Sequence, residues 1–477
     1  MKKVCFIFLI SFCSLFFLYA QNDEVNGEES PAQPETQTTG EEPEPISELA
    51  EETEDDADKK EAPAKRPFKL PSWMTSEGAS LSTGRQETRK TFELGIADIT
   101  LLTSLKGFNL FEIDSWSGFD PADMKDFNMD IAFFVNPIYF RLPVKNVFVF
   151  DFFTGTDITA RVNLPEKTIS TLKKIRELAS GDTPDSISEL QNYINWLKNN
   201  EINNGMAAGV NAFLEMGIGA SKTILNDRLW LRAAPSVFFT LFYMKHKEIS
   251  LNGYNNSDNT QFGLEGNGSI DLYSAWDLDR TVNPFNSPGV DITLEALYAV
   301  WPVLDAGLSI SHIPLVPSTL NYRMSLDVSD ISMYVDTTDP SSMIQFNMPD
   351  VDKMIMSSDN ENKQIFRPVR FDLYALAKPF KSPVLIIRPN IGATVNTAFS
   401  DSAFFNWGLN IQFNAPKIFS AFIGTGLTED VWAQRLGLSF NLRFFELDLG
   451  AALAGSSFVE SWSGQGFIVS IGLKAGF

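Results

Sequence analysis

Apolar and polar residues alternate one by one over many short segments between residues 92 and 477. In 436–441, for example, Leu436, Leu438 and Phe440 are separated by small or polar residues. Successive side chains of a β-strand point to opposite faces, so such a segment forms a strand with one apolar and one polar face. The pattern therefore predicts an all-β protein.

The alternating segments follow one another in a regular way, joined in turn by short and by longer connections. They start near Phe92, Met129, Val147, Gly209, Leu229, Asp291, Leu304, Val369, Val384, Phe404, Ile418, Ala433, Glu446 and Gln465. Short turns at one end and longer loops at the other are typical of outer-membrane barrels. The sequence predicts a transmembrane antiparallel β-barrel of about 14 strands with both termini in the periplasm. Segments 262–273 and 320–335 also have strand character and either extend hairpins or add a strand.

A soluble β-sandwich or a periplasmic barrel would show the same alternation with its apolar face inward. The polar faces are rich in Gly, Asn and Ser, which suits a lumen better than a surface in bulk water. Aromatic residues flank strands at Trp230, Trp301 and Trp432, where a membrane interface favours them. After residue 20, no stretch reaches the ~18–20 apolar residues of a transmembrane helix. These features favour a barrel that spans the outer membrane.

Two predicted strands depart from simple alternation. In the first, Phe92, Leu94 and Ile96 share one face, but Ile99 and Leu101 lie on the other. A β-bulge between the two sets would restore the register. The third strand is apolar on both faces, with Phe148, Phe150 and Phe152 on one and Val147, Val149 and Phe153 on the other. We expect it to pack on something inside the barrel as well as on lipid.

The last strand ends the chain on an aromatic residue. Its apolar face carries Phe467, Val469, Ile471, Leu473 and Phe477. A final amphipathic strand closed by a terminal Phe resembles the assembly signal of bacterial outer-membrane β-barrel proteins. The resemblance implies the barrel-assembly machinery as a partner and outer-membrane lipid as the surroundings.

The N-terminal residues predict export. Residues 1–20 form a secretory signal peptide, because Lys2 and Lys3 precede an apolar run from Val4 to Leu18. Cys13 leaves a lipoprotein signal open as an alternative. Both cysteines of the chain lie in this signal, so the exported part has no disulfide to stabilise it.

Two segments separate the signal from the barrel. Residues 21–64 carry 16 acidic residues against two Lys, a net −14 of the chain's −22, and predict a disordered tail. This tail is a solvated spacer, or it recruits a basic partner or reaches the cell wall. Residues 65–91 are basic and carry the apolar side chains of Phe68, Leu70, Trp73 and Met74. They predict either a linker or a plug that folds into the lumen and pairs with Glu215, Glu446 or Asp448.

Residues 166–204 have helical periodicity inside the predicted barrel, which occupies 92–477. Apolar residues recur at helical spacing at Ile169, Leu172, Ile175, Leu178, Ile187, Leu190, Ile194 and Leu197. Ser186 and Glu189 form a capping box that predicts the start of the second helix. This helical hairpin either caps the outer mouth or decorates a loop.

A barrel of this size is too wide for strand side chains alone to fill it. The candidate lumen-lining residues are Arg388, Asn390, Asn410, Arg435, Arg443, Glu446, Asp448 and Lys474. Their charges suit polar solutes, whereas the doubly apolar third strand suits hydrophobic ones.

The predicted architecture, with a candidate plug before the first strand, resembles the long-chain fatty-acid transporter family of outer-membrane proteins, including its spirochaete-type relatives. The resemblance implies passage of hydrophobic molecules through a plugged barrel with a side opening in the third strand. Val149, Phe153 and Gly155 are then candidate lateral-gate residues, with Gly155 as the kink. The chain has no Asn-Pro-Ala near the mature N-terminus, a feature of the family's plug, so no ligand residue is carried over.

Three functions remain in view: a diffusion transporter for hydrophobic or amphipathic small molecules, a general porin, and a surface adhesin that binds through 244–290 and 313–368. We expect no enzyme, because His246 and His312 lie on different segments and the adjacent Ser311 should point away from His312. We expect no metal or other cofactor and no nucleic-acid partner. The oligomeric state is left open.

Overall fold

The computed structural model describes the barrel region and the segments attached to it. The described residues are 93–105, 127–144, 148–164, 166–179, 184–199, 202–226, 228–255, 261–276, 283, 285–327, 332–336, 345–347, 355–380, 384–415, 419–442 and 444–476. The predicted signal peptide (1–20), acidic tail (21–64) and candidate plug (65–91) lie outside them, as do Arg443 and Phe477.

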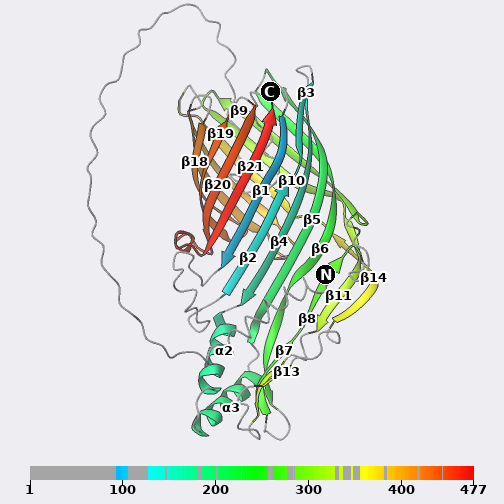
Figure 1. The fold of residues 1–477 in the computed structure, drawn as a ribbon, viewed down its shortest axis with the longest axis vertical. Coiled ribbons are helices and arrows are strands. Elements are labelled where there is room, and N and C mark those ends of the chain that lie inside the picture. Colours follow the sequence, from blue (N-terminus) through cyan, green and yellow to red (C-terminus); the bar gives the residue numbers. More distant parts are fainter. Residues whose placement is uncertain are drawn as a thin grey trace, which may run out of the picture. The chain divides into compact units, whose positions relative to one another are not determined.

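Within the described residues, fourteen strands pair antiparallel in chain order and close when the last pairs with the first (Figure 1). They are β1 (Glu93–Leu105), β2 (Phe127–Asn136) continued by β3 (Tyr139–Val144), β4 (Phe148–Leu164), β5 (Ile202–Ile224), β6 (Leu229–Asn255), β9 (Pro288–Trp301), β10 (Leu304–Val316), β15 (Val369–Ala377), β16 (Leu385–Val395), β17 (Phe404–Ala415), β18 (Phe419–Thr428), β19 (Val431–Asn441), β20 (Phe445–Gly455) and β21 (Gly466–Gly476). The predicted strand number is therefore confirmed. The predicted starts are also close, except that β5 begins at Ile202 rather than near Gly209.

The second barrel strand is interrupted between β2 and β3. Pro137 and Ile138 lie in this gap, and a proline has no backbone N–H to donate to a ladder. Across the gap, the backbone N–H of Thr154 on β4 donates to the carbonyl of Ile138 at 3.0 Å. The register of β1 with β21 also shifts between Gly95 and Ala97, so the first strand contains the predicted bulge.

One side of the barrel continues as a second group of strands. This extension contains the end of β6 with β7 (Gln261–Asn267), β8 (Ser269–Ser274), β11 (Ser318–Asp327), β12 (Ser332–Asp336), β13 (Gln345–Asn347) and β14 (Ile355–Ile365). The segments 262–273 and 320–335 thus extend hairpins and add no strand to the barrel. We call the barrel end that carries this extension the long-loop end, and the opposite end the short-turn end (Figure 1).

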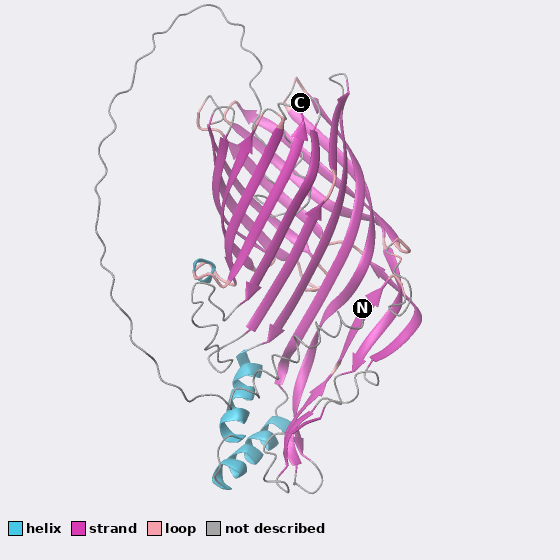
Figure 2. Cartoon of the chain, viewed as in Figure 1, coloured by secondary structure: helices cyan, strands magenta, loops and turns pink. Residues whose placement is uncertain are grey.

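The helical insert contains α2 (Glu166–Ala179) and α3 (Pro184–Asn199), as Figure 2 shows. The second helix starts before the predicted cap at Ser186, because Pro184 fits the first position of a helix, where no N–H partner is needed. Ile194 and Leu197 are fully buried on α3, which packs against β6 and β7 of the extension. A short 3₁₀ helix, η5 (Glu460–Trp462), joins β20 to β21. None of the described helices is long and apolar enough to cross a membrane.

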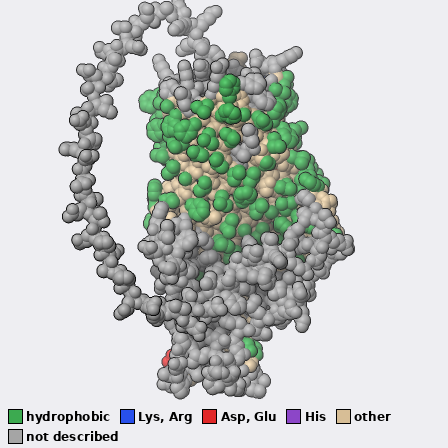
Figure 3. Space-filling view, in the orientation of Figure 1, with side chains coloured by type: hydrophobic (Ala, Val, Ile, Leu, Met, Phe, Trp, Pro, Cys, Tyr) green, Lys and Arg blue, Asp and Glu red, His purple; other side chains and the backbone are tan. Residues whose placement is uncertain are grey.

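Burial in the barrel is the reverse of that in a soluble protein. Apolar side chains point outward and are widely exposed, for example Ile218 at 62% and Phe405 at 60%. Figure 3 shows hydrophobic side chains spread over the visible wall of the barrel. Charged side chains such as Arg232, Arg388 and Asp448 point inward and are 3–4% exposed. An apolar exterior around a polar lumen is the arrangement that a bilayer requires of a spanning barrel.

Several inward-facing aromatic rings lie directly over glycines of the neighbouring strand. The ring and glycine partners are Phe153 with Gly217, Phe238 with Gly289, and Tyr374 with Gly307. A Cβ built at Gly217 would lie only 2.3 Å from Cζ of Phe153. These glycines therefore make room for rings that fill part of the lumen.

Candidate functional site

Many charged side chains in the described part of the lumen form ion pairs between segments distant in the sequence. The pairs are Arg232 with Asp151 and Glu295, Arg367 with Glu215 and Asp291, Lys378 with Asp305 (2.8 Å), Arg388 with Asp372 (3.2 Å), and Lys474 with Asp448 (2.6 Å) and Glu446 (3.4 Å). All are partly or wholly buried, so each partner offsets the desolvation of the other. The wall of the lumen is thus polar but largely charge-compensated.

The structure places the predicted lumen-lining residues on the inward face wherever it describes them. Arg388, Asn390, Asn410, Asp448 and Lys474 are buried, and Arg435 and Glu446 are half-buried. The three acidic residues predicted to pair with a basic plug already form ion pairs with other residues of the barrel. Glu215 pairs with Arg367, and Lys474 takes both Glu446 and Asp448.

At the long-loop end, the connection between β16 and β17 folds into the barrel. Ala398 and Phe399 in this connection are buried within an aromatic cluster that includes Phe213 and Phe404. The hydroxyl of Tyr243 on β6 donates to the carbonyl of Thr397 at 3.0 Å. Because β9, β10 and β15 separate β6 from β16 along the wall, these contacts cross the lumen.

The turn between β18 and β19 makes a second crossing at the same end. The Glu429 carboxylate pairs with Arg370 of β15 at 3.7 Å and accepts a hydrogen bond from Asn396 Nδ2 at 3.2 Å. The backbone carbonyl of Glu429 accepts a hydrogen bond from Arg161 Nη2 of β4 at 2.7 Å. Arg161 also forms an ion pair with Asp130 of β2. We call these two crossings together the lumen closure. The alternation of apolar and polar residues does not predict either crossing, although the apolar Phe399 in a short polar loop is a signal of the first.

A cavity with a volume of about 110 Å³ lies inside the barrel beside the lumen closure. Apolar side chains on one side of it are Leu102, Ala132, Phe134, Val431, Ala433 and Ile468. Charged side chains that also line it are Asp130, Arg161, Arg370, Glu429 and Arg435. An apolar pocket with a few convergent polar groups is the usual form of a site for a small organic molecule.

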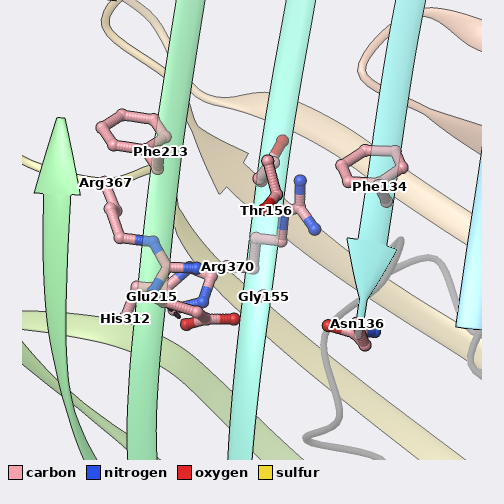
Figure 4. Close-up of a pocket in the computed structure, with 10 residues that line it drawn as sticks. Phe134, Asn136, Gly155, Thr156, Phe213, Glu215, His312, Arg367 and Arg370 are labelled. Carbon is pink, nitrogen blue, oxygen red and sulfur yellow. Dashed lines mark hydrogen bonds and ion pairs between the residues drawn. The ribbon is translucent and has the colours of Figure 1, made fainter. Parts of the chain in front are cut away.

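A second cavity, of about 10 Å³, lies nearer the gap in the second strand (Figure 4). It has room for about one water. Gly155, Glu215 and Arg367 line it, and a Cβ at Gly155 would lie 2.7 Å from Glu215 Oε1. Gly155 therefore provides clearance for the Glu215–Arg367 ion pair.

The candidate lateral-gate strand has no kink. β4 pairs with β5 in unbroken register from Val149 to Asn163, so Gly155 does not bend the chain. The interruption lies one strand away, at Pro137 and Ile138. Val149 is half-buried and Phe153 is buried against Tyr139 and Ala234, which gives this strand its expected packing inside the barrel. A lateral opening stays a prediction.

Ser311 and His312 do not point to opposite faces, so the prediction that they point apart is wrong. β10 is irregular between Ile310 and Ile313, and His312 has φ of 58°, so both side chains are buried instead of facing opposite ways. His312 Nδ1 contacts the Pro368 carbonyl at 3.0 Å. Within the described ranges, no group of three His, Cys, Asp or Glu side chains is arranged to hold a metal.

The closed barrel, its apolar exterior and its polar lumen define an outer-membrane β-barrel protein, and they fit the resemblance drawn from the sequence. Among solved structures, the chain is similar to the toluene transporter TodX of Pseudomonas putida (7% identity, TM-score 0.40, 86% of this chain and 94% of that chain). It is also similar to the monoaromatic hydrocarbon channel CymD (9%, 0.43, 86% and 94%) and to a FadL homologue of Pseudomonas aeruginosa (8%, 0.40, 87% and 96%). At these TM-scores the likeness assigns no function to this chain. No protein-family model matches the sequence, and no curated protein matches it.

Proposed function

We propose that this protein lets hydrophobic or amphipathic small molecules diffuse across the outer membrane. The observation that carries the proposal is the cavity beside the lumen closure. Its wall is apolar on Leu102, Phe134 and Ile468, whereas much of the lumen wall carries paired charges. An apolar surface inside a water-filled barrel gains stability when an apolar solute covers it.

The lumen closure supports the same function. A general porin needs a continuous water-filled path, whereas Phe399 and Glu429 make contacts that cross this lumen. The gap at Pro137 and Ile138 supplies a place where a solute leaves sideways, beside the exposed rings of Phe148, Phe150 and Phe152 on β4. We place the short-turn end and both chain termini in the periplasm, as the export signal and the even strand number favour.

A general porin for polar solutes is the second candidate, favoured by the paired charges and the buried Asn and Gln side chains of the lumen. In a porin, the lumen closure would open readily and small sugars would pass. The two functions therefore differ in which solutes move.

The test uses cells whose lipopolysaccharide excludes the apolar dye N-phenylnaphthylamine, with and without the protein in their outer membrane. We expect faster dye uptake with the protein, and little effect on sugar entry. Ala433→Trp should slow uptake, because Ala433 is 1% exposed and a bulkier side chain there fills the cavity. Ala451→Trp is the matched control, since Ala451 faces outward on the neighbouring strand. Dye uptake equal to that of cells lacking the protein, together with sugar entry, would identify a porin.

A further inference from the structure

Three hydrogen-bond donors lie in one row of the lumen wall. Arg388 on β16 pairs in register with Asn410 on β17, which pairs with Gly424 on β18, which pairs with Arg435 on β19. Residues in one antiparallel row point to the same face of the sheet, and burial places this row on the inward face. The strands are ~4.8 Å apart, so the long arginine side chains can converge.

The donors of this row have few acceptors. Arg388 is 3% exposed and donates from Nη2 to Asp372, but its Nε and Nη1 have no hydrogen-bond partner. Asn410 is 1% exposed, and neither its Nδ2 donor nor its Oδ1 acceptor has a partner. Among the ion pairs between described residues, none includes Arg435. A buried donor without an acceptor costs ~1–3 kcal/mol, so several in one place indicate a missing acceptor.

Charge leads to the same conclusion. Arg388 and Arg435 place two like charges on one inward-facing row of the wall. The acid beside them, Asp372, already accepts from Arg388 and from Asn390 Nδ2 at 3.0 Å. Elsewhere in this lumen, each buried cation described above has a carboxylate partner. An anion between the two arginines would supply the charge that the wall lacks.

There is room for an anion at this place. The Asn410 amide group covers Gly424, so the room lies beside Arg435 and not over the glycine. Arg435 also lines the cavity of about 110 Å³, which exceeds the space of one water several times. The Arg435 end of the row is therefore reachable from inside the barrel.

We propose that Arg388, Asn410 and Arg435 form an anion site on the lumen wall that holds one anionic oxygen group. The group is either a free oxyanion such as inorganic phosphate or the carboxylate of a solute with an apolar tail. Arg435 supplies the uncompensated charge, and Arg388 and Asn410 supply the additional donors. The site goes beyond the proposed function and does not depend on it.

The test is calorimetric titration of the refolded protein in an uncharged maltoside detergent, with phosphate and then octanoate, at constant ionic strength. We expect saturable binding to the unchanged protein. Arg435→Met should weaken it at least about tenfold, because charge-assisted hydrogen bonds are lost. Arg228→Met is the matched control, since Arg228 is an exposed arginine in a turn, and it should bind as the unchanged protein does.

Asn410→Asp separates the site from a general folding defect. It places a carboxylate of nearly the same shape between the arginines, so we expect it to abolish anion binding while the melting temperature stays equal or rises. If phosphate and octanoate compete for binding, the site accepts free oxyanions. If octanoate binds and phosphate does not, the site holds the carboxylate head group of a solute with an apolar tail. The proposal would be overturned if neither phosphate nor octanoate bound the unchanged protein. It would also be overturned if both Arg435→Met and Asn410→Asp kept the binding of the unchanged protein. Because no transport is measured, such a result leaves the proposed diffusion function untouched.

Discussion

Arg161 and Glu429 lie 268 positions apart in the chain, yet Arg161 Nη2 donates to the Glu429 carbonyl at 2.7 Å. Arg161 belongs to β4, and Glu429 to the turn after β18, so the contact joins separate parts of the barrel wall. The ring of Phe399 lies 5.1 Å from the same guanidinium group. One arginine thus holds both crossings of the lumen closure.

Arg161→Met should loosen the lumen closure. We expect larger and more frequent conductance steps in planar bilayers than the unchanged barrel gives. The free energy of unfolding should fall by ~3–5 kcal/mol, since Asp130 stays buried without its partner. Adding Asp130→Asn should restore part of the stability and keep the conductance high.

Arg323→Met is the control for the Arg161 variant. Arg323 pairs with Asp271 at 2.9 Å, but both lie in the extension, outside the barrel wall. The control should leave conductance unchanged. If Arg161→Met and Arg323→Met gave the same conductance as the unchanged protein, Arg161 would not hold the closure.

Gly217→Ala should destabilise the barrel, because Cζ of Phe153 occupies the space of the new methyl group. Overpacking of this kind costs ~1–3 kcal/mol. The measurement is the midpoint of guanidinium chloride unfolding in detergent micelles. Phe153→Leu removes the ring, so the double variant should be more stable than the sum of the two single effects predicts. Additive effects would show that the ring and the glycine do not interact.

The strand number was predictable because each barrel strand carries its own alternation of apolar and polar residues. The lumen-facing side of Arg388 and Asp448 followed from the same alternation. What the sequence did not predict are contacts between distant segments, such as Tyr243 with Thr397, since nothing near either residue encodes the other. The irregularity at His312 was also missed, because a positive φ at a non-glycine residue has no local sequence signature.

Deleting Phe477 should slow assembly into the membrane. The residue before it, Gly476, pairs with Glu93 of β1 at the closing seam, where β21 carries exposed Val469 and Ile471. The fraction of folded protein over time is measured from its faster migration in unheated gels. Phe477→Tyr keeps the terminal ring and should assemble at the normal rate. Equal rates for the deletion, the tyrosine variant and the unchanged chain would count against an assembly signal.

Pro137→Ala should slow the uptake of apolar solutes if they leave through the gap in the second strand. The substitution restores a backbone N–H where β1 and β4 flank the interruption, so it favours a continuous ladder. Pro389→Ala is the matched control, because Pro389 is also exposed but lies inside a continuous strand, in unbroken register with β17 opposite Leu409. Uptake of N-phenylnaphthylamine should fall in the first variant only, while the anion binding expected of Arg435 stays the same in both. Equal uptake in both variants would mean that the solute does not pass through this gap, whatever route it takes along the lumen.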